Sequence, residues 1–237
     1  MERDERLGSA AASIGALEDD LRRKMYTFIR RAGRPVARDE AAQAVGISRK
    51  LAAFHLDKLV DRGLLSSHYA RPPGRSGPGA GRSAKYYEPS EDLVEVSLPP
   101  REYDVVGAIL VDAIVESENG SSAKEVAGRI AFEKGLALGK EVKAESGLRP
   151  PGAERAISVA ERVLDANGYE PYRDEAGALR LRNCPFHDLS RRSPELVCGL
   201  NKSFVEGLLR GIGNDSVTAE LDRRPGECCV RLSAPAS

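Results

Sequence analysis

The sequence predicts an α+β protein in two parts: an N-terminal helical module that ends in a basic hairpin, and a C-terminal domain of helices on a small antiparallel sheet. Three observations predict this fold class. Apolar residues recur at helical spacing over much of the chain. A loop rich in Gly, Pro and Arg separates two strand-like runs near residue 75. Two further strand pairs, each joined by a turn, occur within residues 170–232.

The first part begins with a helix over residues 16–31, whose apolar side chains form a stripe at helical spacing. A short helix at residues 39–45 and a longer helix at residues 49–62 follow, joined by a tight glycine-containing turn. Ser48 is a suitable N-cap for the longer helix, because its hydroxyl can accept a backbone N–H of the first turn. Gly63 suits the left-handed residue just past the end of that helix.

The longer helix has two different faces. The apolar face is expected to pack inward and consists of Ala52, Leu56, Leu59, Val60 and Gly63. The opposite face carries Lys50, Leu51, Phe54 and Lys58. Its two lysines could contact phosphate groups. For Phe54 two interpretations stay open: contact with thymine methyl groups and ordinary packing on the first helix.

A hairpin with a long loop follows the helices. Residues 64–69 read as a strand and residues 84–87 as its return, while the sequence RPPGRSGPGAGRS between them is neither helix nor regular strand. The hairpin carries the cations Arg71, Arg75, Arg82 and Lys85. Cations are expected there if the hairpin lies along a phosphate backbone. A helix-turn-helix followed by such a hairpin is a winged helix, which we predict over residues 16–90.

Charge is divided unevenly along the chain. The 36 Lys and Arg balance the 36 Asp and Glu, so the formal net charge is zero. Residues 21–85, however, contain fifteen Lys or Arg against four Asp or Glu, a local charge of +11, which leaves −11 for the rest of the chain. This division indicates a polyanionic partner for one part only. The alternative is a solvated basic face without a partner.

Two runs carry a resemblance to a known family. AAFHLDKLVDRGLL at residues 52–65 and GRSAKYYEPS at residues 81–90 resemble the recognition helix and second wing strand of winged-helix repressors of the ArsR/MarR-like type. The resemblance implies a sequence-specific regulator that binds a double-stranded DNA operator. The residues expected at the DNA are Ser48, Arg49, Lys50, Phe54, Lys58, Arg71, Arg75, Arg82 and Lys85.

Several other classes of protein are disfavoured. No apolar run approaches the ~18–20 residues that span a bilayer, and the acidic start MERDERLGSAAASIGALEDD is not a secretory signal. We therefore expect a cytoplasmic protein without a membrane partner, with residues 1–15 as a mobile N-terminus. The chain has three histidines and no CxxC, phosphate loop, dinucleotide fingerprint or recognisable Ser/His/Asp set, so we expect no enzyme activity.

The segment REYDVVGAILVDAIVE, residues 101–116, predicts a helix with a broad apolar face. This face is wider than the packing of a small domain requires, so residues 91–118 are expected to form a linker and dimerisation helix that pairs with its mate in a homodimer. A two-fold dimer suits a protein that reads two half-sites about one DNA turn apart. The alternative is a helix that packs on its own C-terminal domain.

Residues 119–237 are expected to form an α+β effector domain. Helices are predicted at residues 121–146, 152–167 and 194–211, and strands at residues 170–173, 178–183, 216–222 and 227–232. Gly128, Gly135 and Gly139 lower the helix propensity of the first of these helices and suggest close contact with another helix on one side.

All four cysteines, Cys184, Cys198, Cys228 and Cys229, lie in this domain, and a cytosolic chain should keep them reduced. His187 follows Cys184 by three residues, a spacing that brings a thiolate and an imidazole to one point. Consecutive strand side chains face opposite ways, so only one of Cys228 and Cys229 is expected to join Cys184 and Cys198. Three thiolates and His187 could hold zinc or an iron–sulfur cluster. A third interpretation is that the cysteines only pack.

A winged helix followed by a domain with three spread-out cysteines resembles the SufR group of iron–sulfur-sensing repressors over about residues 21–232. The resemblance implies a [4Fe–4S] cluster held by Cys184, Cys198 and either Cys228 or Cys229, although the gaps between cysteines look slightly longer than in that group. The expected function is a DNA-binding transcriptional repressor controlled by this cluster or by a metal such as zinc. The alternative is a winged-helix regulator of a small organic effector, with structural cysteines.

Overall fold

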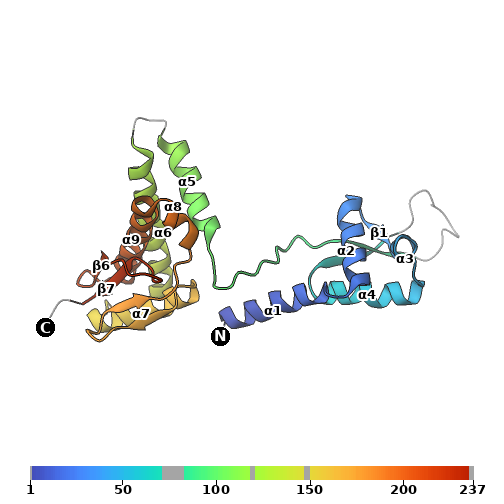
Figure 1. Cartoon of the computed structure of the whole chain (residues 1–237), viewed down its shortest axis with the longest axis horizontal. Helices are drawn as coiled ribbons and strands as arrows, with labels where there is room; N and C mark the ends of the chain where they lie inside the picture. The colour runs from blue at the N-terminus through green and yellow to red at the C-terminus, as the bar shows by residue number, and fades with distance from the viewer. Residues whose placement is uncertain (1, 71–82, 118–120, 147–149, 235–237) are drawn as a thin grey trace. The chain divides into compact units, whose positions relative to one another are not determined.

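The computed structural model describes residues 2–70, 83–117, 121–146 and 150–234 (Figure 1). The chain is α+β and divides into two compact units, Met1–Val96 and Ser97–Ser237. Each unit has its own buried core. None of the helices in the described ranges combines the length and apolar character needed to cross a lipid bilayer.

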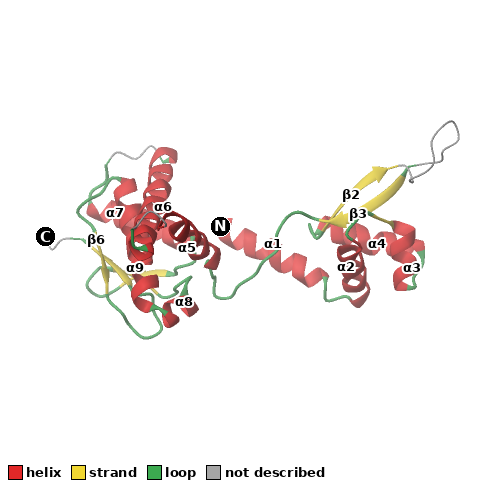
Figure 2. Cartoon of the chain, turned by 90° about the horizontal axis from the view of Figure 1, so that it is seen from above, coloured by secondary structure: helices red, strands yellow, loops and turns green. Residues whose placement is uncertain are grey.

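Unit 1 combines four helices with a three-stranded antiparallel sheet of order β1-β3-β2 within the described residues. Its elements are α1 (Glu2–Ala16), α2 (Asp20–Ala32), β1 (Val36–Ala37), α3 (Arg38–Val45), α4 (Arg49–Asp61), β2 (Leu65–Ala70) and β3 (Ala84–Pro89). The β2–β3 hairpin lies beside α2 and α4 (Figure 2). This arrangement places α4 and the hairpin on the same small core.

The N-terminal end of unit 1 differs from the sequence prediction. Residues 1–15 were expected to be a mobile segment, but α1 covers Glu2–Ala16, and the predicted helix over residues 16–31 begins only at Asp20. The Asp19 side chain accepts the Arg22 backbone N–H at 3.0 Å and caps α2. The Ser13 hydroxyl donates to the Arg62 carbonyl oxygen at 2.7 Å, which fastens α1 beyond the end of α4.

The core of unit 1 forms between α2, α3, α4 and the sheet. Met25 and Ile29 of α2 and the predicted inward residues of α4, Ala52, Leu56 and Leu59, are fully buried. Tight turns on both sides of α4 use left-handed glycines, Gly46 (φ 72°) and Gly63 (φ 68°). The inward face of α4 predicted from periodicity is therefore confirmed at these three residues, whereas Val60 is only half-buried and Gly63 is exposed.

Unit 2 packs helices on a four-stranded antiparallel sheet of order β4-β5-β7-β6 within the described residues. Its elements are α5 (Tyr103–Ser117), α6 (Ala123–Glu145), α7 (Ala153–Ala166), β4 (Pro171–Arg173), β5 (Leu179–Leu181), α8 (His187–Arg192), α9 (Pro194–Ile212), β6 (Thr218–Leu221) and β7 (Val230–Ser233). Helix α8 was not predicted. The predicted helices and strands are present with ends shifted by a few residues.

Helices α6 and α9 lie against each other, and α5 lies against α6 (Figure 1). Four glycines make the closest approach possible: a Cβ at Gly135 would overlap the Phe204 carbonyl oxygen, and a Cβ at Gly207 would overlap that of Phe132. Further along the helices, a Cβ at Gly139 would overlap the Leu208 carbonyl oxygen, and a Cβ at Gly211 would overlap that of Leu136. The close contact predicted for α6 is confirmed, except that Gly128 faces open space beyond the Ser203 side chain.

Helix α5 belongs to unit 2 and does not stand apart as a linker. Val106, Ile109 and Ala113 are buried against the rest of that unit. The structure therefore differs from the predicted separate linker over residues 91–118. The boundary between the two units falls at Val96, and half of the apolar face of α5 is buried inside unit 2. Val111 and Val115 remain exposed on the other side.

Candidate nucleic-acid interface and candidate metal centre

Helix α4 presents its outer face to solvent. Lys50 is exposed, Leu51 is 40% exposed and Phe54 is 63% exposed. Packing of Phe54 on the first helix, one of the two interpretations from the sequence, is therefore wrong. Its nearest aromatic neighbour is His55, at 5.4 Å between ring centroids. A large apolar side chain beside a cation on an outward helix face is able to contact a base edge and a phosphate together.

Two residues predicted at the DNA also have structural roles. Ser48 accepts the Leu51 backbone N–H at 3.2 Å and caps α4 as expected. Arg49 forms an ion pair with Asp39 at 2.5 Å, which joins the start of α4 to α3. Both side chains of that pair are mostly exposed, so water and salt weaken it and leave the Arg49 guanidinium able to exchange partners.

Lys85 holds the hairpin to α4. Its amine contacts Asp57 at 2.7 Å, and the Tyr87 hydroxyl donates to the same carboxylate at 3.1 Å. Burial raises the pKa of Asp57, but the hydrogen bonds from Lys85 and Tyr87 outweigh burial and leave this pKa below its usual value. Lys85 is thus a positioning residue that fixes β3 against the outward-facing helix.

The remaining residues predicted at the DNA are less informative. Arg71, Arg75 and Arg82 lie outside the described residues. Lys58 is half-buried near the end of α4. The two histidines of unit 1 have internal neighbours: His55 is buried with Nδ1 4.0 Å from Asp19, and His68 stacks on Tyr86 and pairs with Glu88 at 3.2 Å.

The four cysteines of unit 2 come together at one place, and none forms a disulfide. Cys184 lies in the turn before α8, Cys198 in α9, and Cys228 and Cys229 directly before β7. Hydrogen bonds connect Cys184 to Cys228, Cys228 to Cys229 and Cys229 to Cys198. We call these four residues the thiol cluster. All four are buried, with at most 6% of the residue exposed.

Both members of the Cys228–Cys229 pair join the cluster, contrary to the prediction that only one would. The prediction assumed a strand from residue 227, in which consecutive side chains alternate. Strand β7 instead begins at Val230, so the pair lies in a loop whose backbone does not impose that alternation. The Cys228 amide donates to the Leu181 carbonyl oxygen at 2.9 Å, which ties the loop to β5.

Burial and mutual hydrogen bonding set the protonation of the thiols. The hydrogen bond with Cys228, together with burial, raises the pKa of Cys184 far above its usual value. For Cys228 the bond with Cys184 lowers the pKa, but the bond with Cys229 and burial outweigh it and raise the pKa to about 12. The pKa of Cys198 is lowered by the bond with Cys229, with help from the Arg223 charge. Cys198 is the thiol that ionises most readily.

A buried arginine holds the loop that carries Cys228 and Cys229. Arg180 on β5 is 1% exposed and pairs with Asp222 at 2.6 Å and with Glu227 at 3.0 Å. The Tyr172 hydroxyl also donates to Glu227, at 2.8 Å. These contacts hold Asp222 at the start of the loop and Glu227 directly before Cys228, so the positions of the two sulfurs depend on residues remote in sequence.

Three of the four cysteines border a cavity. Cys184, Cys198, Cys229 and the half-buried His187 line a cavity of about 380 Å³, together with Arg191, Arg223 and Arg224. The arginines would offset the negative charge of thiolates and of a bound cluster. Within the described ranges, however, no three or more His, Cys, Asp or Glu side chains are arranged around a point where one metal ion would fit.

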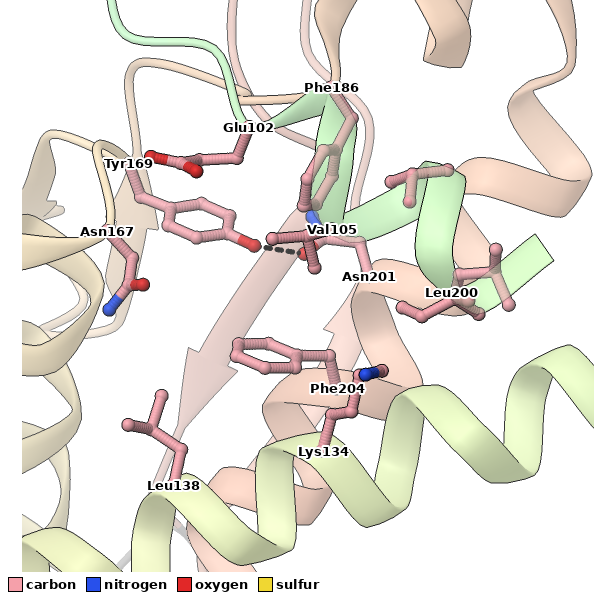
Figure 3. A pocket seen from close by; sticks show the side chains of 12 residues that line it. Glu102, Val105, Lys134, Leu138, Asn167, Tyr169, Phe186, Leu200, Asn201 and Phe204 are labelled. Carbon is pink, nitrogen blue, oxygen red and sulfur yellow. Dashed lines mark hydrogen bonds between the residues drawn. The ribbon is translucent and has the colours of Figure 1, made fainter. Parts of the chain in front are cut away.

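A second, apolar cavity of about 220 Å³ lies between α5, α6 and α9 (Figure 3). The Tyr169 hydroxyl donates to Asn201 Oδ1 at 2.7 Å at one wall, and Asn201 Nδ2 lies 3.1 Å from the Cys228 sulfur. Sequence reasoning missed this cavity. The one signal available was Asn201, a polar residue on the otherwise apolar inward face of a predicted helix.

Comparison of the chain with protein-family models, with curated proteins and with solved structures finds no match.

Proposed function

We propose that this chain is a homodimeric, sequence-specific DNA-binding transcriptional repressor, with a winged helix-turn-helix in unit 1 and an iron–sulfur or metal sensor in unit 2. The observation that carries the DNA-binding part is α4, a helix buried on one face and exposing Lys50, Leu51 and Phe54 on the other. A helix with this division, next to a basic hairpin, is suited to the major groove while the hairpin follows the phosphates.

The thiol cluster supports the sensor part. Cys184, Cys198 and the Cys228–Cys229 pair come from three separate segments, so a group that they hold together would clamp the turn before α8, α9 and the loop before β7. An iron–sulfur cluster bound there would make this clamp dependent on iron supply and redox conditions. Zinc is the alternative occupant, and it would supply structural cross-linking without redox chemistry.

The exposed face of α5 supports the homodimer. Val111, Ile114 and Val115 are between 60% and 64% exposed, and they lie on one helix next to each other. A second copy of the same face would bury these side chains in an isologous contact. Two recognition helices would then read two half-sites of a double-stranded operator. The proposal places the chain in the cytoplasm and gives it no enzyme activity.

A second candidate function is a DNA-binding regulator whose effector is a small organic molecule and whose cysteines only pack. The apolar cavity lined by Tyr169, Asn201 and Phe204 favours this candidate, because concave apolar pockets with a few polar groups are typical of small-molecule sites.

The absorption spectrum of anaerobically purified protein separates these candidates. A bound iron–sulfur cluster gives brown protein that absorbs near ~400 nm, and this absorption should be lost in Cys198→Ser. Colourless protein that contains stoichiometric zinc would show that zinc, and not an iron–sulfur cluster, is bound. Colourless, metal-free protein that still binds DNA would rule out the sensor assignment in favour of the second candidate.

A further inference from the structure

We infer that the apolar cavity between α5, α6 and α9 binds a small aromatic carboxylate, and that its occupancy is transmitted to the thiol cluster through Tyr169 and Asn201. The inference rests on the second candidate function for its regulatory meaning. Binding and transmission are both measured without DNA. We define the cavity by six of its lining residues, Val105, Ile109, Lys134, Leu138, Tyr169 and Phe204; Figure 3 labels all of them except Ile109.

The shape and lining of the cavity set the ligand's size and its apolar character. A volume of about 220 Å³ exceeds the ~150 Å³ that accommodates benzene and is below the range of drug-sized pockets, so a ligand of about a dozen non-hydrogen atoms fits. The rings of Tyr169 and Phe204 lie on opposite sides of the space in Figure 3, and Phe186 lines it too. Aromatic side chains favour a flat aromatic ligand between them.

The charged groups at the cavity set the ligand's charge. Two ionisable side chains of opposite sign line it, Glu102 and Lys134. Glu102 already interacts within the chain, including electrostatically with Tyr169. Lys134 is exposed on α6, and no hydrogen bond or ion pair connects it to the described part of the chain. A ligand with its ring inside and a carboxylate at the rim would pair with this ammonium group.

Two buried side chains connect the cavity to the thiol cluster. Tyr169 is 1% and Asn201 2% exposed, and both line the cavity. The Tyr169 hydroxyl donates to Asn201 Oδ1 at 2.7 Å, and Asn201 Nδ2 donates to the Cys228 sulfur at 3.1 Å. A ligand that shifts the Tyr169 ring therefore moves the donor that faces Cys228, because a buried amide cannot lose one partner without reorienting.

The test titrates the full-length protein with 1-naphthoate and reads binding by isothermal titration calorimetry, which works equally for wild type and variants. We expect a dissociation constant on the order of 100 μM, binding about tenfold weaker in Lys134→Gln, and no binding in Leu138→Trp, which fills the cavity. The exposed Lys140 on the same helix supplies the matched control, and Lys140→Gln should bind like the wild type.

Two comparisons can disprove that the cavity binds an aromatic carboxylate. Equal binding by wild type and Leu138→Trp, or no binding by the wild type, would show that the cavity is not a ligand site. Binding of 1-naphthylmethylamine as tight as that of 1-naphthoate would refute the preference for an anion.

Transmission is read by hydrogen exchange of the backbone amides of residues 222–230, a measurement that works with or without a bound metal. Naphthoate should change this exchange at least twofold in the wild type, because it displaces the Asn201 donor that faces Cys228. In Tyr169→Phe it should bind within about twofold of wild-type affinity and leave the exchange unchanged. A response that persists in Tyr169→Phe, or that is absent in the wild type, would refute the connection. Neither result depends on DNA binding, so a failure here and a failure of the proposed regulator function are distinguishable.

Discussion

Among single residues, Arg180 connects the loop of the thiol cluster to a neighbouring strand. It is almost completely buried, and it holds the carboxylate of Asp222 at the start of the β6–β7 loop and that of Glu227, which directly precedes Cys228 and Cys229. Removing one member of a buried ion-pair network leaves the others without their partner. The geometry of the cysteines is therefore tied to a residue on a neighbouring strand.

Arg180→Met should lower the free energy of unfolding by about 2 kcal/mol, less than for a fully buried pair because the two carboxylates are partly exposed to water. It should also reduce the iron or zinc content of the purified protein, because the loop no longer holds Cys228 and Cys229 in place. Urea denaturation and metal analysis measure the two effects. Arg162→Met, at an exposed position on α7, should change the stability by less than about 0.5 kcal/mol; an equal loss in both variants would contradict the role of Arg180.

The same network predicts a pH dependence. Hydrogen bonds from Arg180 lower the pKa of Asp222. Burial raises the pKa of Glu227, but the hydrogen bonds from Tyr172 and Arg180 outweigh burial and leave this pKa below its usual value. A carboxylate whose pKa is lowered in the folded state contributes stability above its usual pKa and loses it as the pH falls through the folded value. Wild-type stability should therefore drop as the pH falls below about 4. In Arg180→Met this part of the drop should be absent from urea midpoints measured between pH 7 and pH 3.

At the level of elements, the contact between α6 and α9 determines the stability of unit 2. Gly207→Ala would place a methyl group against the Phe132 carbonyl oxygen, so the two helices must move apart. We expect a loss of about 3 kcal/mol in unfolding free energy, measured by urea denaturation. Gly199→Ala on the same helix meets nothing within 4 Å and should stabilise by up to about 1 kcal/mol. Similar changes in unfolding free energy in both variants would mean that the effect of Gly207→Ala comes from helix propensity and not from the close approach of α6 and α9.

The hairpin is a separate element with a separate prediction. Arg75 and Arg82 lie outside the described residues, but the Lys85–Asp57 contact fixes the end of the hairpin nearest its loop to α4. If the hairpin follows the phosphates, the double variant Arg75→Ala, Arg82→Ala should bind DNA more weakly. Its plot of log affinity against log salt should flatten by roughly one unit per lost contact. An unchanged slope would remove the hairpin from the DNA interface.

The sequence predicted elements that depend on local patterns and missed those that depend on distant contacts. The inward face of α4 was predicted from helical spacing and the close contact of α6 from its glycines, and both are confirmed in part, except at Gly63 and Gly128. The six-residue helix α8 was missed because it is too short for a periodic pattern. Tyr169, Asn201 and Cys228 are 32 and 27 residues apart in successive hydrogen bonds, so no local pattern could reveal their connection.

For the whole molecule, oligomeric state tests the role of α5. Val111, Ile114 and Val115 form an exposed apolar face, and we expect a dimer of twice the chain mass of 25.6 kDa by light scattering. Ile114→Glu should shift the protein to the monomer, because a buried charge at a two-fold contact meets its own copy. Leu221→Glu, at an exposed apolar position on β6, should remain dimeric. A wild-type monomer, or a dimeric Ile114→Glu, would contradict this role.

The most direct measurement compares DNA affinity in two states of the thiol cluster. The protein first selects duplexes from a random library at low salt, and the affinity for the selected duplex is then measured for metal-loaded protein, for protein stripped of metal by a chelator, and for Cys198→Ser. We predict that loaded and stripped protein differ at least tenfold, a coupling of about 1.4 kcal/mol, and that Cys198→Ser behaves like the stripped form. Selection of no duplex, or the same affinity in all three forms, would contradict a DNA-binding regulator controlled by its cysteines.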